Sequence, residues 1–171
     1  KGGRAVGVAC DVTNGDARKA LVDAAVAQFD KINILVNNAG GGGPKPFDMP
    51  METFRWAFEL NVFSVFNLSQ VCAPHIEQAG GGAILNISSM AAENKDVRMA
   101  SYASSKAAES HLTRNIAFDL GPKNIRVNAI APGAIKTAAL ATVLTPEIEK
   151  VMLKHTPMGR LGEGRDIAHA A

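Results

Sequence analysis

Short runs rich in Val and Ile alternate along the chain with long helical stretches, and this alternation constrains the fold more than any other feature. Strands that are nearly continuously apolar and joined by crossovers of this length predict an α/β fold with a doubly wound parallel sheet and helices on both faces. The four expected strands are Ala5–Val12, Ile32–Asn38, Ala83–Ser88 and Ile125–Ile130, and the three expected helices are Asp16–Phe29, Met51–Gln78 and Ser101–Leu120.

The helix boundaries have their own chemistry. Asn14 or Asp16 can cap the first helix, and Pro50 suits the start of the second. Pro74 should kink or end that second helix, because proline cannot donate the helical hydrogen bond. Gly121-Pro122 should stop the third.

Charge and composition argue against several classes of protein. Eighteen Lys and Arg face sixteen Asp and Glu, which gives a net charge of +2 without basic runs, so we expect no nucleic-acid partner. Every apolar stretch is interrupted by polar residues, so we expect no membrane association. Cys10 and Cys72 lack any metal or disulfide spacing and are expected to be buried thiols of a cytoplasmic protein. No metal site is expected from the scattered histidines His75, His111, His155 and His169.

No repeat or long linker divides the chain, so residues 1–171 are expected to form one domain. A dinucleotide-binding fold normally opens with a strand, a glycine-rich turn and a helix, and that unit is missing here. The chain begins without Met and stops inside a helical pattern, which predicts a fragment incomplete at both termini. Gly40–Gly43 precedes prolines rather than a helix, and it fits either a flexible turn or a substrate loop.

Tyr102 is the only tyrosine, and Lys106 follows it one helical turn later. A phenol has an ordinary pKa of ~10, and a neighbouring ammonium favours the phenolate, which makes general acid–base chemistry feasible near neutral pH. The pair alone would also fit a tyrosine packed on a lysine stem. However, Ser88 and Ser89 close the preceding strand, at the edge where this fold binds its ligands.

Other segments are expected at the same sheet edge. Asn37–Gly40 follows the second strand and Ala131–Gly133 follows the fourth, and both offer turns with little side-chain bulk against which a flat cofactor could lie. Asp11 ends the first strand. Each of these segments also fits an ordinary turn or helix cap, but together they predict a ligand site.

These residues resemble the short-chain dehydrogenase/reductase family. The resemblance runs nearly the whole chain and implies a Rossmann-type sheet that exchanges hydride between a nicotinamide cofactor and an alcohol or ketone. It is carried by Asp11-Val12, Asn37–Gly40, Asn61, Ser89, Tyr102–Lys106 and Asn128–Gly133.

The resemblance implies a role for each catalytic residue. Tyr102 would take the proton of the substrate hydroxyl, and Ser89 would hydrogen-bond the same oxygen. Lys106 would favour the phenolate and bind the nicotinamide-ribose hydroxyls. Asn61 would help relay the proton to solvent, although a buried, hydrogen-bonded amide of the core also fits that position.

The resemblance also implies binding residues. Asp11 and Val12 would lie near adenine and Asn38 beside its ribose, in a cofactor set that includes Ala39, Gly40, Tyr102, Lys106, Pro132, Gly133, Ile135 and Thr137. Gly42 and Asn94 would join Ser89 and Tyr102 around the substrate. The cofactor is expected to be NAD, with NADP not excluded, since the discriminating residue would precede Lys1.

Four loop and pocket stretches resemble the bacterial 7-alpha-hydroxysteroid dehydrogenases more closely, which implies a bile acid or related steroid as substrate. Those stretches are Gly40–Pro50, Ser89–Lys95, Arg114–Gly121 and Thr145–Glu149. Another reductase of the family, acting on 3-oxoacyl-carrier-protein or a sugar alcohol, is the first alternative. A non-catalytic binding protein of the same fold is a remote one.

Aromatic side chains surround more of the second helix than one core-facing stripe requires. They fit either core packing or a subunit interface, and the resemblance implies a homotetramer built on the helices that carry Asn61 and Tyr102. The aromatic residues are Phe54, Trp56, Phe58, Phe63 and Phe66.

Overall fold

The computed structural model describes residues 2–171 and contains a three-stranded parallel sheet. Its strands are β1 (Ile34–Asn37), β2 (Gly82–Ile87) and β3 (Ile125–Ile130), which lie side by side in that order. Both neighbouring pairs are parallel. Three of the four expected strands and the parallel sheet are therefore confirmed, and their carboxyl ends share one edge.

The first expected strand, Ala5–Val12, is absent, and that prediction is wrong for this structure. The segment forms no ladder with the sheet, and Val6 and Val8 are exposed. Apolar alternation marks a segment that can pair, but a strand exists only where a neighbouring backbone supplies the hydrogen bonds. Among residues 2–171, no strand lies beside this segment.

The expected helices are present with nearly the expected limits. Helix α1 (Gly15–Phe29) starts at Asn14, whose side chain accepts hydrogen bonds from the Asp16 and Ala17 N–H groups. Helix α4 (Ala100–Leu120) ends in a 3₁₀ turn, η3 (Gly121–Lys123). Asn14 therefore caps α1 as the sequence predicts, and α4 ends at Leu120, directly before the predicted stop at Gly121-Pro122.

The second expected helix is continuous but irregular. It consists of α2 (Met51–Phe58), a π-helical segment η1 (Glu59–Phe63) and α3 (Ser64–Gln78). Pro74 lies inside α3 and does not end it. The carbonyl that loses its bond to the missing N–H belongs to Gln70, an exposed residue that water can reach, so the helix tolerates the proline.

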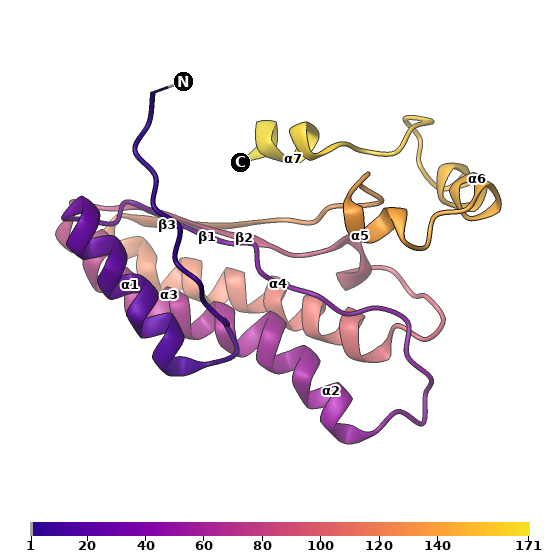
Figure 1. Cartoon of the computed structure of the whole chain (residues 1–171), viewed down its shortest axis with the longest axis horizontal. Coiled ribbons are helices and arrows are strands. Elements are labelled where there is room, and N and C mark those ends of the chain that lie inside the picture. Colours follow the sequence, from indigo (N-terminus) through magenta and orange to yellow (C-terminus); the bar gives the residue numbers. More distant parts are fainter. Residues whose placement is uncertain (1) are drawn as a thin grey trace.

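Helices α1, α3 and α4 cover one face of the sheet (Figure 1). The other face carries Ile34 and Val36, which are 66% and 52% exposed. Within residues 2–171, the three long helices pack on this one face, and the short helix α7 (Gly164–Ala170) lies on the other side of the sheet. The core between the helices and the sheet consists of Val22, Leu68, Cys72, Ala73, Ile76, Ile84, Ile116, Ile125 and Val127.

The C-terminal part holds three short helices, α5 (Ala138–Ala141), α6 (Pro146–Lys154) and α7 (Gly164–Ala170). In Figure 1, α7 lies on the side of the sheet opposite α1, α3 and α4. Gly162 fastens this part to the segment after β3, because its N–H donates to the Ala134 carbonyl and its carbonyl accepts from the Lys136 N–H.

The two thiols differ. Cys72 is buried, which raises its pKa to about 11, whereas Cys10 is partly exposed, so the expectation of two buried cysteines is correct for one. Across the described residues, no helix combines the length and apolar character that crossing a membrane requires. Nor do residues 2–171 place three His, Cys, Asp or Glu side chains as a metal ion would need.

Candidate functional site

Residues from three elements converge at the carboxyl edge of the sheet. Gly40 follows β1, Asn61 lies on η1, and Lys106 lies on α4. A Cβ on Gly40 would lie 3.1 Å from both Asn61 Oδ1 and Lys106 Nζ. The backbone of this turn thus passes directly over the two polar side chains, as the sequence predicts for a ligand-binding edge.

Asn61 is fully buried, and all its polar atoms are engaged. Its Oδ1 accepts a hydrogen bond from the Gly41 N–H at 3.0 Å, and its Nδ2 donates to the Gly41 carbonyl at 2.9 Å. The same Nδ2 donates to Ser105 Oγ at 2.9 Å. Asn61 therefore joins the glycine turn to α4. The π-helical segment η1 places Asn61 between these two elements, and π-helical segments are frequent at functional sites.

Lys106 is buried, and its ammonium has two acceptors. It donates to the Ile87 carbonyl at the end of β2 at 2.8 Å and to Glu109 Oε2 at 2.6 Å. The sequence-based prediction assigns this ammonium to Tyr102 and the ribose hydroxyls and gives no role to Glu109. The spacing of three residues on one helix was the available indication of the pair.

Tyr102 lies one turn before Lys106 on α4, as expected, and is partly buried. The backbone of Gly42 covers one edge of its ring, where an added Cβ would approach Tyr102 Cδ2 to 2.8 Å. Gly42 also has φ +132°, a conformation that other residues rarely adopt. Gly42 is therefore packed against the tyrosine, and its role in binding a substrate stays a prediction.

The serines after β2 divide their tasks. Ser88 is buried, and its Oγ contacts the Lys106 carbonyl and Ser110 Oγ, which joins β2 to α4. Ser89 is partly exposed at the start of the 3₁₀ turn η2 (Met90–Ala92), where its Oγ accepts from the Ala91 N–H. Of the two, Ser89 is the hydroxyl that a ligand can reach.

A buried polar chain supports the site from below. Asn37 Nδ2 donates to Asn86 Oδ1 at 2.9 Å, and Asn86 Nδ2 donates to Thr113 Oγ1 at 2.9 Å. The Thr113 hydroxyl in turn donates to the Glu109 carbonyl. These bonds join the ends of β1 and β2 to α4, so the strand ends are held rigidly against the helix that carries Tyr102 and Lys106.

The turns after β2 and β3 are tied together. The Met90 N–H donates to the Pro132 carbonyl at 2.9 Å, and Gly133 follows on the exposed side. Ile135 forms a single parallel bridge with Gly162. Thr137 caps α5 by accepting from the Leu140 N–H. The predicted residues Pro132 and Gly133 thus lie next to the turn that begins at Ser89.

The residues expected at adenine lie in the turn before α1. Asp11 Oδ1 accepts from the Thr13 N–H and hydroxyl, and these bonds lower the pKa of Asp11. The Val12 carbonyl accepts from the buried Arg18, which also donates to Asn67 of α3. No contact places this turn beside Tyr102 or Lys106 within residues 2–171.

Other predicted residues are exposed around the edge. Asn38 and Ala39 lie exposed directly after β1, in line with Gly40. Asn94 is exposed after η2, with its N–H donating to the Met90 carbonyl. These three residues are available to a ligand, and their binding roles stay predictions.

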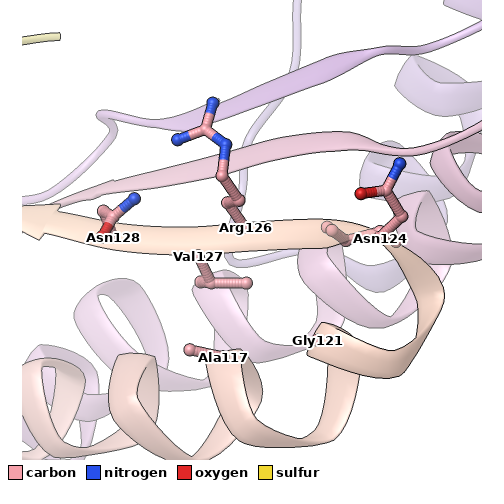
Figure 2. A pocket seen from close by; sticks show the side chains of 7 residues that line it. Ala117, Gly121, Asn124, Arg126, Val127 and Asn128 are labelled. Carbon is pink, nitrogen blue, oxygen red and sulfur yellow. The ribbon is translucent and has the colours of Figure 1, made fainter.

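A shallow pocket of about 340 Å³ lies away from this site (Figure 2). It runs along the outer edge of β3 and the end of α4, with Asn124 and Gly121 at the amino end of the strand. Figure 2 shows Val127 pointing from β3 toward Ala117, whereas Arg126 points away from the helix. The pocket belongs to the open strand edge and not to the carboxyl ends of the strands.

The residues at the carboxyl edge fit a nicotinamide dinucleotide. The turns at Gly40 and Gly133 carry little side-chain bulk, so a flat group can approach the backbone there. Gly40 itself has no room for a side chain without approaching Asn61 and Lys106 to 3.1 Å. Close backbone approach beside a buried ammonium suits ribose hydroxyls and a carboxamide, which need both donors and acceptors.

Comparisons with known proteins agree with this site. The family model described as Enoyl-(Acyl carrier protein) reductase matches residues 1–171. The chain is 65% identical over 170 residues to the 7alpha-hydroxysteroid dehydrogenase of Escherichia coli (strain K12), covering 99% of this chain and 67% of that protein. It is 37% identical over 164 residues to the 7alpha-hydroxysteroid dehydrogenase of Paraclostridium sordellii, covering 94% of this chain and 61% of that protein.

A solved structure is similar in fold as well as in sequence. It is a 7 alpha-hydroxysteroid dehydrogenase complexed with NADH and 7-oxo glycochenodeoxycholic acid, and it matches this chain with a TM-score of 0.92 and 66% identity. The match covers 94% of this chain and 63% of that one. The chain thus spans somewhat less than two thirds of that solved structure.

Proposed function

The chain belongs to the short-chain dehydrogenase/reductase family, and from that premise we propose that the protein is a nicotinamide-dependent oxidoreductase acting on the 7α-hydroxyl of bile acids. The observation that carries the proposal is the convergence of Gly40, Asn61 and Lys106, since a Cβ on Gly40 would lie 3.1 Å from both Asn61 Oδ1 and Lys106 Nζ, with Tyr102 one helical turn before Lys106. We propose NAD as the cofactor, since the similar solved dehydrogenase is complexed with NADH.

When bound, the nicotinamide supplies the hydride acceptor for oxidation of the alcohol and the hydride donor for reduction of the ketone. In the oxidation, the Tyr102 phenolate accepts the hydroxyl proton while the hydride leaves the carbinol carbon. Ser89 donates a hydrogen bond to the same oxygen, which orients the alcohol. Lys106 stabilises the phenolate electrostatically and donates to ribose hydroxyls.

The proton on Tyr102 must then reach solvent. We propose that Asn61 takes part in this relay by holding the Gly41 backbone and Ser105, so that ordered water can connect Lys106 to the surface. Gly42 and Asn94 contact the steroid beside Ser89. Asp11, Val12 and Asn38 contact the adenosine, and Ile135 and Thr137 contact the carboxamide.

We propose that residues 1–171 belong to one catalytic domain and that the protein is a cytoplasmic homotetramer. Three aromatic side chains on the α2–η1–α3 helix support the assembly, since Trp56, Phe63 and Phe66 are 50%, 53% and 47% exposed and so are not core residues. Phe118 on α4 is 88% exposed. Light scattering should give a mass near four subunits, and a monodisperse monomer would refute the assembly.

The test of function uses the protein expressed from its complete reading frame. Formation of reduced nicotinamide is followed with a 7α-hydroxy bile acid, its 7β epimer and a 3-hydroxyacyl thioester, with NAD and NADP separately. We expect turnover of the 7α compound with NAD alone. Activity confined to the thioester would keep the family chemistry and refute the steroid assignment.

Tyr102→Phe is the decisive variant, because it removes the proton acceptor and keeps the ring that packs under Gly42. We expect kcat to fall by ~10²–10⁴-fold, the range that general acid–base catalysis contributes. Unfolding by urea should be nearly unchanged. Retention of wild-type kcat would show that another group takes the proton.

A further inference from the structure

A buried ion pair lies directly beneath the site. The side chains of Lys106 and Glu109 are 5% and 1% exposed, and the distance between Lys106 Nζ and Glu109 Oε2 is 2.6 Å. The Ile87 carbonyl, at 2.8 Å, is the second acceptor of the ammonium. The proposed chemistry uses the ammonium and leaves the carboxylate without a task.

Stability alone does not account for this carboxylate. Its second oxygen, Oε1, is buried and has no hydrogen-bond partner within residues 2–171. Burial raises the pKa of Glu109, and the Lys106 ammonium only partly opposes that effect. Since buried ion pairs are often no more stabilising than apolar side chains of similar volume, an acidic residue at this position calls for a further role.

The pair has a fixed order along α4. Tyr102 comes one turn before Lys106, and Glu109 comes one turn after it, so the ammonium lies between the phenol and the carboxylate in the sequence of the helix. Gly40 also lies close to the ammonium, since a Cβ on Gly40 would lie 3.1 Å from both Lys106 Nζ and Asn61 Oδ1. The negative charge of Glu109 therefore acts on the Lys106 ammonium, which in turn supports the Tyr102 phenolate.

Within the described residues, no other charged side chain on the elements that pack against α4 bonds to the Lys106 ammonium or the Glu109 carboxylate. The thiol of Cys72 on α3 is neutral at ordinary pH, because burial raises its pKa to about 11. Arg126 on β3 points away from α4 (Figure 2). Three ion pairs engage most of the remaining groups: Glu59 with Arg18, Arg55 with Glu52, and Lys123 with Glu77. His75, in the last turn of α3, contacts neither Lys106 nor Glu109 through a hydrogen bond or ion pair in the described part of the chain.

We propose that Glu109 is a positioning residue for Lys106, which holds the ammonium against the end of β2 and balances part of its charge, and thereby sets the pH at which Tyr102 accepts the substrate proton. This inference rests on the proposed function. An ionised Glu109 weakens the electrostatic support that Lys106 gives to the phenolate. Removal of that negative charge favours the phenolate, so oxidation should begin at lower pH.

The experiment compares pH–rate profiles for oxidation of the 7α-hydroxy bile acid by the wild type, Glu109→Gln and Glu109→Asp. In Glu109→Gln the acid limb of kcat should move to lower pH by roughly half to one unit, less than the ~1–3 units of a charge in direct contact. The KM for the steroid should not change, because Glu109 lies beneath the site. Glu109→Asp keeps the charge and should restore the wild-type profile.

Glu77→Gln is the matched control, because Glu77 forms the same type of pair with Lys123 at 2.8 Å, with both side chains nearly half exposed. Its profile should coincide with that of the wild type. If Glu109→Gln does not fold, Glu109→Leu removes the same charge, fills similar volume and should move the limb in the same direction.

The outcomes separate the two proposals. The role of Glu109 is overturned if the wild type oxidises the steroid but the acid limb of Glu109→Gln stays in place or moves to higher pH. That result leaves the proposed function intact. A wild type without turnover on any alcohol overturns the proposed function, and the role of Glu109 with it.

Discussion

Two regions of the molecule contain similar polar contacts, which are buried in one region and exposed in the other. The first region is the layer of helices α1, α3 and α4 with the segment η1, and the second is the C-terminal segment after Thr137. In the former, Asn61 is fully buried, and its oxygen accepts from a backbone N–H twenty residues away. In the latter, Thr145 is exposed at the start of α6, and its hydroxyl accepts from the N–H of Ile148, three residues away.

The difference lies in what each contact specifies. A buried polar group without a partner is costly, so the contacts of Asn61 permit only one arrangement of the glycine turn, η1 and α4. An exposed cap competes with water and fixes only its own helix. The chemistry therefore depends on the buried region, where geometry is determined by contacts between distant parts of the chain.

Truncation of matched isoleucines should show the largest contrast. Ile76 on α3 is fully buried, whereas Ile148 on α6 is 39% exposed. Ile76→Ala should lower the free energy of unfolding by roughly 2–5 kcal/mol, because it leaves a cavity in the core. Ile148→Ala should lower it by less than about 1 kcal/mol. Urea unfolding measures both, and equal effects would contradict the division between the two regions.

Removal of the side-chain acceptors of Asn61 and Thr145 should lower the free energy of unfolding less than the truncation of Ile76 does. Asn61→Ala leaves the Gly41 backbone unpartnered, and we expect a loss of roughly 1–3 kcal/mol in the free energy of unfolding. The same variant should lower kcat, because the glycine turn loses its anchor. Thr145→Ala should cost about 1 kcal/mol or less and leave kcat unchanged. An inactive Thr145→Ala would show that α6 shapes the site.

The smallest predicted effects concern two carboxyl groups whose pKa values shift in opposite directions. Burial raises the pKa of Glu109 above its ordinary 4.5, so the folded state binds that proton more tightly than the unfolded state. Stability from this group falls as pH rises above about 4.5. Two hydrogen bonds from Arg160 instead hold the pKa of Asp166 far below its ordinary 3.8, so its contribution is lost only as pH falls below that value.

Urea midpoints measured at roughly pH 5 and pH 8 separate the two groups. The urea midpoint of Glu109→Gln should decrease less between pH 5 and pH 8 than the midpoint of the wild type does. Asp166→Asn should differ from the wild type by the same amount at both values, since Asp166 is ionised throughout. If the urea midpoint of Glu109→Gln depended on pH as strongly as that of the wild type, the Glu109 carboxyl of the wild type would not be buried in solution.

The sequence predicts most of the site, but not how its residues are held. Tyr102 and Lys106 on one helix, Ser89 after a strand and Gly40 after another follow from local spacing. The partners of Lys106 and Asn61 do not follow from local spacing. Ile87 lies 19 residues from Lys106 along the chain, and Ser105 lies 44 residues from Asn61. The first strand was wrongly predicted for the same reason, since pairing depends on a neighbour that local pattern cannot supply.

By itself, the sequence determined the alternation of strands and helices, the caps at Asn14 and Gly121, and the residues that place the chain in its family. These features depend on side chains within a turn or two of one another, so they are encoded locally. The tertiary structure alone decided which face of the sheet the long helices cover, that η1 is π-helical at Asn61, and that Glu109 forms a buried ion pair with Lys106. Burial creates these features, because a polar group removed from water must find its partners wherever the fold brings them.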